Sequence, residues 1–260
     1  MKTKCLSLIL CGLLLFSSAC GNVAQTGALH TESRTVEVGG AETVDVALTI
    51  SAGTLHVTGG AADLLAADFT YNVDAWQPEV DYTVNNGRGI LQVRQPHNVA
   101  FNFPGVKDAR NEWQVQLSDA IPMDLAITVG AGEGDLKLGT LTLDNLDIQT
   151  GAGSVTIDLH DGHVRHLDIL SGVGAVTLDL GGVWQDDLVV NVKGGVGALT
   201  VALPSQVNVH AEVHGGLGKL VTTGLQQDGN ALVHKASASD VRLTLDIEGG
   251  LGQVELTVPE

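Results

Sequence analysis

Aliphatic and polar residues alternate along most of the chain from Thr35 onward, and pairs of glycines interrupt this alternation at regular intervals. Between Gly130 and Leu203 one phrase recurs as GAGEGDLKL, GAGSVTIDL, GVGAVTLDL and GVGALTVAL. Alternation is typical of β-strands with one buried face, because successive side chains of a strand point to opposite sides. The pattern therefore predicts many short strands and an all-β fold.

The glycine pairs recur with a fixed period. Gly132, Gly153, Gly174 and Gly197 are the second glycines of the four copies and lie 21, 21 and 23 residues apart. The motif returns around Gly218 after 21 residues and around Gly252 after 34. Such a period is typical of stacked structural repeats. Two short strands and two corners fit into about 21 residues, which predicts one coil of a parallel β-solenoid.

The aliphatic positions of successive periods match. Val155, Ile157 and Leu159 correspond to residues 176, 178 and 180 one period later. We expect these side chains to stack into buried columns, in which each contributes roughly 1.5–3 kcal/mol. Glycine at a corner accommodates positive φ and lets neighbouring coils approach to about 4.8 Å. Asp161-Gly162, Gly181-Gly182 and Pro204-Ser205 are expected to form the opposite corners.

The pattern divides the chain into an N-terminal β domain (35–120) and C-terminal solenoid repeats (121–260). In the first part, Gly53 marks a degenerate repeat, and Asn86-Gly87 between alternating segments predicts an added β-hairpin. Residues 95–111 are expected to form a long loop. Residues 224–240 are expected to protrude as a loop from the last coils. The final strand, 253–258, is expected to end the stack, blunted by Pro259.

The first residues have the pattern of an export signal. Lys2 and Lys4 precede an apolar run, Leu6 to Phe16, that is shorter than the roughly 20 residues needed to span a bilayer. We predict a signal peptide over 1–19, lipidation at Cys20, and a lipidated flexible tether over 20–34. The ending Ser18-Ala19-Cys20 resembles a bacterial lipobox. Cleavage without lipidation, which would release a secreted protein, is the alternative.

Composition narrows the possible partners. The formal net charge is −17, and removal of the two N-terminal lysines makes it more negative, which argues against nucleic-acid binding. The cysteines are Cys5, Cys11 and Cys20, so an exported chain would have no internal disulfide and would depend on its core. The expected partners are a membrane, through the lipid at Cys20, and envelope proteins or cell-wall glycan.

The chain resembles the toast-rack group of bacterial envelope proteins. The residues that carry the resemblance are ISAGTLHVTG (50–59), WQPEVDYTV (76–84) and the segment 124–153, and the likeness covers roughly residues 36–220. The C-terminal part is similar to the cell-wall-active-antibiotics response domain of LiaF-like proteins. The resemblance implies a location in the cell envelope and a link to envelope-stress signalling. It supplies no catalytic residues.

The motifs that could carry chemistry have structural explanations. Gly151-Ala152-Gly153 leads into a strand, whereas a dinucleotide site needs G-x-G-x-x-G opening a helix. Gly132-Glu133-Gly134-Asp135 resembles one calcium-binding nonapeptide, but the other copies lack the acid. His160, His163 and His166 are weak candidates for a metal site at one corner. Asp147 over Asp168, and Asp158 over Asp179, should form acidic pairs that a divalent cation could relieve.

The sequence therefore predicts a non-enzymatic envelope lipoprotein that acts as a structural or interaction scaffold, with no cofactor. No G-x-S-x-G motif occurs, and aromatic residues make up 3% of the chain, too few for the ring platforms on which sugars stack. The alternative is a module that binds glycan or a cell-wall precursor through N-terminal loops, with Trp76 and Trp113 as candidate ligand-binding residues. A binding module would line a pocket with these tryptophans, whereas a scaffold would bury them.

Overall fold

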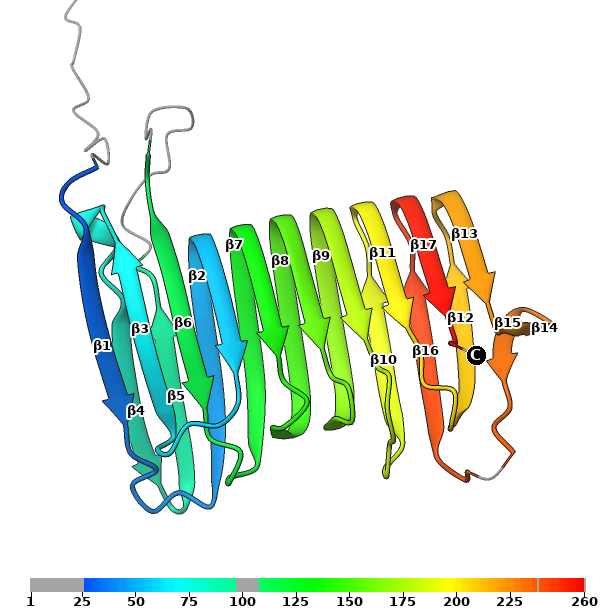
Figure 1. The fold of residues 1–260 in the computed structure, drawn as a ribbon, viewed down its shortest axis with the longest axis horizontal. Helices are drawn as coiled ribbons and strands as arrows, with labels where there is room; N and C mark the ends of the chain where they lie inside the picture. The colour runs from blue at the N-terminus through cyan, green and yellow to red at the C-terminus, as the bar shows by residue number, and fades with distance from the viewer. Residues whose placement is uncertain (1–25, 97–107, 238, 260) are drawn as a thin grey trace, which may run out of the picture.

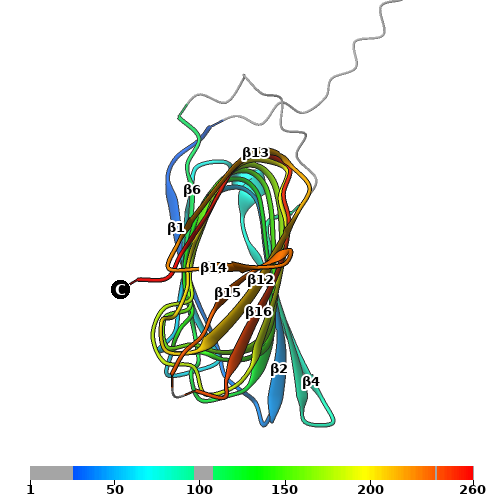
Figure 2. The same cartoon turned by 90° about the vertical axis from the view of Figure 1, so that its right-hand side faces the viewer.

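A computed structural model describes residues 26–96, 108–237 and 239–259, which form an elongated all-β solenoid (Figure 1). The view along its long axis shows two sheets facing each other and joined at two edges (Figure 2). Apart from the short 3-10 turn η1 (Asp74–Trp76), the described residues form strands and the turns between them. The predicted fold class, a parallel β-solenoid with an added hairpin, is confirmed.

Strands of two kinds build the coils. Four long strands run through a glycine corner and contribute to both sheets: β2 (Thr43–Thr58), β7 (Met123–Lys137), β8 (Thr142–Asp158) and β9 (His163–Asp179). Three later coils have one strand in each sheet: β10 (Leu188–Lys193) with β11 (Val196–Ala202), β12 (Asn208–His214) with β13 (Leu217–Thr223), and β16 (Arg242–Glu248) with β17 (Leu251–Thr257). We call the sheet before each glycine corner the first sheet and the one after it the second sheet.

The remaining strands flank these coils. They are β1 (His30–Val36), β3 (Leu65–Tyr71), β4 (Glu79–Asn85), β5 (Arg88–Arg94), β6 (Asn111–Leu117), β14 (Gln226–Asp228) and β15 (Ala231–His234). At the N-terminal end, β5 and β6 pair with the two halves of β2, and β4, β3 and β1 extend the sheets by antiparallel pairing. The β4–β5 hairpin is the predicted one, with positive φ at Asn86 and Gly87.

The glycine repeat sets the register of the parallel pairs. Gly53 pairs with Gly132, Gly132 with Gly153, and Gly153 with Gly174, so the degenerate early copy is a true coil of the stack. The predicted aliphatic columns are confirmed, and Ile157, Leu178 and Val201 are fully buried. One cluster of buried side chains extends from Val44 to Val258, so strands on both sides of residue 120 share a core.

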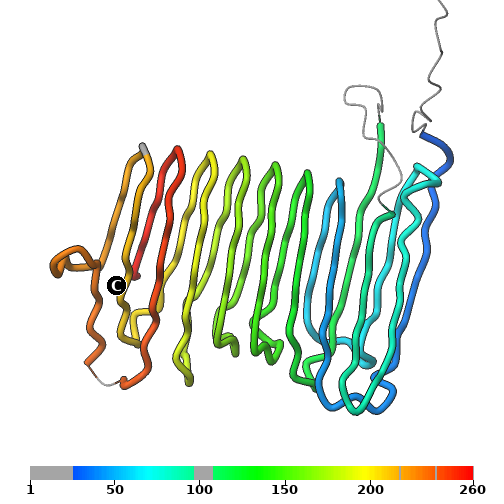
Figure 3. The backbone as a smooth tube through the Cα atoms, turned by 180° about the vertical axis from the view of Figure 1, so that it is seen from behind, coloured from blue at the N-terminus to red at the C-terminus, as the bar shows by residue number. Residues whose placement is uncertain are grey.

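The order of the last coils differs from the expected order. The C-terminal coil, β16 and β17, lies between β10–β11 and β12–β13, and therefore does not end the stack (Figures 1 and 3). The blunting role expected for Pro259 is therefore wrong. The segment 224–240, expected to be a loop, contains β14 and β15. Because β15 pairs antiparallel with β12, it covers the exposed edge of the first sheet.

The N-terminal boundary also differs from the expected one. The tether was expected to reach Arg34, but β1 begins at His30 and pairs with β3, so residues 30–34 belong to the folded body. The expected signal peptide and Cys20 lie outside the described residues, as do residues 97–107 of the expected loop.

The β5–β6 coil has a polar network in place of a glycine corner. Gln95 Oε1 accepts hydrogen bonds from the backbone N–H groups of Ser51 (2.9 Å) and Ala52 (3.2 Å). Asn111 Nδ2 donates to Ala52 O at 2.7 Å and to Gln95 Oε1 at 3.1 Å, and Asn111 Oδ1 accepts from Trp113 Nε1 at 3.0 Å. Gln95 and Asn111 are buried. These side chains satisfy the backbone of the β2 corner, which would otherwise be buried without partners.

Candidate functional site

The two edges of the solenoid differ in chemistry, and the edge formed by the glycine corners has the most distinctive surface. We define this glycine edge as seven five-residue corners, in spatial order 50–54, 129–133, 150–154, 171–175, 194–198, 249–253 and 215–219. The backbones touch here: a Cβ added at Gly153 would lie 1.8 Å from the carbonyl oxygen of Gly132. Gly153 also has φ 135°, which residues with a side chain rarely adopt.

The side chain at the third position of each corner, directly before the glycine that pairs between coils, becomes larger along the edge. In spatial order it is Ala52, Ala131, Ala152, Val173, Val196, Leu251 and Leu217. Val173, Val196 and Leu251 are 58%, 48% and 51% exposed, which is unusual for aliphatic side chains in a protein with a continuous core. We call these three residues the aliphatic ridge. It runs along the C-terminal half of the glycine edge.

Charge is nearly absent from the glycine edge. Among its seven corners, Glu133 and Lys219 are the charged residues. The opposite edge carries exposed acids in its turns, namely Asp119, Asp161, Asp186, Asp187 and Asp240. A strongly acidic protein therefore has one edge that is almost neutral and partly apolar, and one that is acidic.

The side chain at the first position of each corner becomes smaller toward the coils that carry the ridge. The first residue of each corner is, in spatial order, Ile50, Val129, Thr150, Ser171, Gly194, Gly249 and Gly215. Where this position is glycine, a cavity of about 80 Å³ remains, lined by residues that include Val192, Leu199 and Ile247. Large residues thus lie outside the corner and small ones inside it in the C-terminal coils.

The chain enters the folded body at the glycine edge. His30 pairs with Tyr71, and Tyr71 with Asn111, whose backbone oxygen lies 2.2 Å from a Cβ built at Gly53. Gly27 N also donates to Asn72 O at 2.6 Å, which places Gly27 beside the residue that follows Tyr71. Figures 1 and 2 show the N-terminal end at the edge where the long strands bend.

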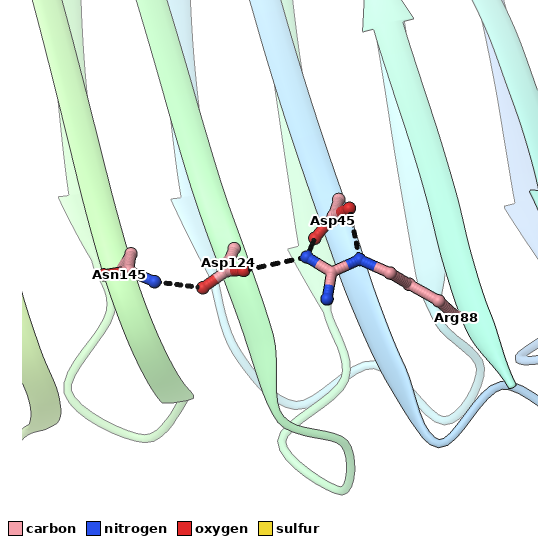
Figure 4. Close-up of polar contacts among 4 residues, drawn as sticks. All are labelled: Asp45, Arg88, Asp124 and Asn145. Carbon is pink, nitrogen blue, oxygen red and sulfur yellow. Dashed lines mark hydrogen bonds and ion pairs between the residues drawn. The ribbon is translucent and has the colours of Figure 1, made fainter.

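A polar row crosses four adjacent strands of the first sheet near the opposite edge (Figure 4). Arg88 forms a bidentate pair with Asp45, in which Nε lies 2.7 Å from Oδ2, and it also donates to Asp124 Oδ2 at 3.1 Å. Asn145 Nδ2 donates to Asp124 Oδ1 at 2.7 Å. The hydrogen bonds to Asp45 raise the pKa of Arg88. The row links the N-terminal strands to the repeat.

A second row carries carboxylates. Asp147 pairs with Asp168 and Asp158 with Asp179, as predicted. Asn191 Nδ2 donates to Asp168 Oδ1 at 2.8 Å, and Asp246 lies beside Asn191 in the register. Partial burial, followed by the negative charges of Asp168 and Asp124, raises the pKa of Asp147.

The three candidate histidines are exposed and do not converge on one point. His160 lies 3.8 Å from carboxylate oxygens of Asp161 and Asp179, whereas His163 pairs with Thr142 and His166 with Asn145 in the strand register. Within residues 26–96, 108–237 and 239–259, no group of three or more His, Cys, Asp or Glu residues is placed to hold a metal ion.

The tryptophans are buried. Trp113 is 0% exposed and packs edge-on against Phe69 at a centroid distance of 5.2 Å, while Trp76 is 2% exposed. Neither ring has a free face on which a sugar could stack. Trp184 is also buried, and its Nε1 donates to Leu180 O at 2.8 Å.

A polar groove of about 450 Å³ crosses the N-terminal part of the second sheet. Its lining includes the side chains of Ser33, Arg34, His56, Asp68, Gln114 and Gln116. These hydrogen-bonding groups could hold a polar ligand, but no aromatic residue is among them. The groove was not foreseen because it joins strands that are distant in sequence.

The aliphatic ridge was also missed by the sequence interpretation. Its signal is present, since the corners read GAG, GAG, GVG, GVG, GLG and GLG along the chain. The glycines recur in every copy and indicate the fold, whereas the residue that varies between them forms the exposed surface of the corner.

Comparison with known proteins gives a family and a likeness to solved structures. The family model for the N-terminal domain of toast_rack matches residues 25–165 and 155–202. A candidate cell adhesion protein from Clostridium sporogenes is 27% identical, with a TM-score of 0.65 over 89% of this chain and 100% of that one. A candidate adhesin from Bacteroides fragilis is 11% identical, with a TM-score of 0.36 over 89% of this chain and 99% of that one. No curated protein matches the chain.

The described residues contain no helix long and apolar enough to cross a membrane.

Proposed function

Because the chain belongs to the toast-rack family, we propose that it is a non-enzymatic lipoprotein of the cell envelope whose folded body serves as a structural or interaction scaffold. The continuous core carries this proposal. Aliphatic side chains fill the space between the sheets from Val44 to Val258, so the body is a rigid plate with two broad, polar faces. Rigid extended surfaces of stacked repeats suit binding to other macromolecules.

The likeness to a candidate cell adhesion protein supports the same function. The alignment spans that entire chain, so the likeness includes the whole solenoid and not one repeat. Adhesion needs an exposed, stable surface outside the cytoplasm. We therefore place this chain at the cell envelope, where envelope proteins or cell-wall glycan are its partners.

The anchor in this proposal is lipid on Cys20, after removal of residues 1–19. The sequence around Cys20 supports it, and the chain offers no other cysteine beyond that point. Diacylation plus a further acyl chain anchors stably, whereas one chain holds marginally. A role in envelope-stress signalling, through a LiaF-like C-terminal part, rests on the sequence resemblance of the repeats.

The test is membrane fractionation of the full chain and its Cys20→Ala variant in a bacterial host, combined with metabolic labelling by a fatty acid. We expect the unmodified chain in the membrane fraction with label, and the variant exported without label. Label that remains on C20A, or a chain that is soluble in both forms, would contradict the lipoprotein proposal. Crosslinking in intact cells then identifies what the exposed faces contact.

The alternative, binding of glycan or a cell-wall precursor, has to use the polar groove, because Trp76 and Trp113 are buried. Co-sedimentation with purified cell-wall sacculi tests it. If Gln114→Ala and Gln116→Ala together abolish co-sedimentation without lowering the melting temperature, the groove is a binding site and the scaffold proposal must be revised.

A further inference from the structure

We propose that the glycine edge rests on the lipid bilayer, with the aliphatic ridge of Val173, Val196 and Leu251 in contact with lipid. The inference rests on the proposed lipid anchor at Cys20 and goes beyond it, since it assigns the orientation of the body and a second membrane contact. The body would then lie along the membrane and display its acidic edge outward.

The ridge is exposed and apolar, as expected for a surface that contacts a membrane or a partner. About half of the surface of each side chain is accessible, although a single change to Ala at these positions would restore the corner of the N-terminal coils. Exposed aliphatic side chains in a continuous row mark contact with a membrane or a partner. Their replacement of alanine is confined to the coils farthest from the N-terminal end.

The charge distribution favours lipid at this edge. The protein has a net charge of −17, which would repel anionic headgroups, yet its glycine edge carries one acid and one base, Glu133 and Lys219. The opposite edge carries Asp161, Asp186 and Asp187. Approach by these corners therefore brings fewer negative charges to the headgroups, and removes less hydration from charged groups, than approach by the opposite edge.

The length of the tether supports the same orientation. Nine residues lie between Cys20 and His30, where β1 begins at the glycine edge, so ten residue steps join the two positions. An extended chain of this length spans at most about 33–36 Å. A lipid on Cys20 would thus keep the glycine edge within this distance of the bilayer, whereas the opposite edge lies a further strand length from the point of attachment.

The start of β1, which follows the proposed anchor in sequence, and the ridge lie at opposite ends of the same edge. In the second sheet, β1 is followed by β3, β6, β2, β7 and β8 before β9, which carries Val173. At roughly 4.8 Å between strands, the ridge begins about 29 Å from β1 and extends to about 38 Å. Lipid at one end and aliphatic side chains at the other would hold the body parallel to the membrane at two places.

A bilayer fits this ridge better than a second copy of the chain. A stable protein interface buries about 800 Å² on each partner, whereas the ridge is a single row of side chains on a narrow edge. A fluid bilayer adapts to a narrow row, and interfacial segments typically insert their apolar side chains by about 5–10 Å. The anchor supplies the affinity, so the ridge needs to contribute only orientation.

The experiment uses the full lipidated chain in phosphatidylcholine vesicles, with an environment-sensitive fluorophore on V196C. The remaining cysteine of the processed chain would be lipidated, so the new thiol is the single labelling site. The matched control is S205C, which is exposed on the opposite edge near the end of the same coil. We expect blue-shifted emission and quenching by doxyl-labelled lipid for V196C, and neither for S205C.

A second variant separates the ridge from the tether. V173S and L251S, added to V196C, should remove the quenching without lowering the melting temperature, because both side chains lie outside the core. If the vesicles float with the protein but V196C is not quenched, or both labels are quenched equally, the inference is overturned and the anchor stands. A blue shift without lipid quenching that grows with protein density would overturn it in favour of a second copy. If the protein does not float, the proposed anchor fails and the inference falls with it.

Discussion

The α-carbon of Gly252 lies against the carbonyl oxygen of Gly197, so that a Cβ built at residue 252 would be 1.6 Å from that oxygen. These glycines are separated by the whole of the β12–β15 segment, yet they are neighbours in the stack. On its other side, Gly252 pairs with Gly218. The C-terminal coil therefore forms backbone hydrogen bonds with a neighbouring coil on each side. It lies inside the stack, although the outer coil, β12 and β13, precedes it in the sequence.

Strand order can be tested by disulfide formation. Ala198 in β11 and Gln253 in β17 are register partners with outward positions, so A198C and Q253C together should oxidise to a disulfide in the folded chain. A198C with K219C is the matched control, because residue 219 lies one strand further and two strand spacings, about 9.6 Å, exceed the roughly 7 Å limit for a disulfide. Non-reducing electrophoresis of the purified proteins shows which pair closes. Bridging of 198 to 219 in place of 253 would place the coils in chain order.

The corner glycines should tolerate no side chain. Gly252→Ala adds a Cβ against backbone on the neighbouring coil at φ 149°, and the backbone cannot yield without breaking two ladders. We expect the free energy of unfolding to fall by about 4 kcal/mol or more, the range of severe core disruptions. Gly229→Ala is the control: it also has positive φ, 63°, but nothing within 4 Å, and should cost about 1–2 kcal/mol. Denaturant unfolding of both variants measures the difference, and equal losses would show that φ alone matters.

The polar network at the β5–β6 coil should be essential for stability. Asn111→Ala leaves Ala52 O and Trp113 Nε1 without their partners in a buried site. We expect a loss of about 2–4 kcal/mol, since each orphaned buried group costs about 1–3 kcal/mol. Gln116→Ala, on the exposed side of the same strand, should change the stability by less than about 0.5 kcal/mol. A loss for N111A no larger than that for Q116A in chemical denaturation would mean that water replaces the side chain.

Removal of the charge of Asp147, which faces Asp168, should raise the stability of the protein at neutral pH but not at acid pH. The pKa of Asp147 in the folded state is raised above its ordinary value of 3.8, so the folded chain binds this proton more tightly than the unfolded chain does. Its contribution to stability therefore decreases as the pH rises through the folded pKa. Asp147→Asn should raise the stability at neutral pH by roughly 0.2–1 kcal/mol, and the gain should vanish below the ordinary value, where both states are protonated.

Melting temperatures of both proteins, measured at neutral pH and at a pH below the ordinary pKa of an aspartate, check this prediction. Asp228→Asn, at the exposed end of β14 and away from the row, controls for the loss of one negative charge. A gain for D147N that persists at the acid pH, or an equal gain for D228N, would assign the effect to overall charge.

Much of the architecture follows from the sequence. The period of the glycines predicts the coil, and the alternation predicts which side chains are buried, because a coil has to repeat the same corner and the same inward positions to stack. Gly53 could be recognised as an early copy for this reason, and the hairpin at Asn86-Gly87 follows from local turn chemistry.

The tertiary structure alone decided which coils are neighbours. Every coil has the same register on both of its sides, so Gly197 could pair with Gly218 or with Gly252 in equal local geometry. The 34 residue steps from Gly218 to Gly252 are long enough to permit either order. The surfaces depend on this choice. The strand order sets Leu251, and not Leu217, beside Val196 in the aliphatic ridge. The buried positions of Trp76 and Trp113 follow from strands that no local pattern brings together.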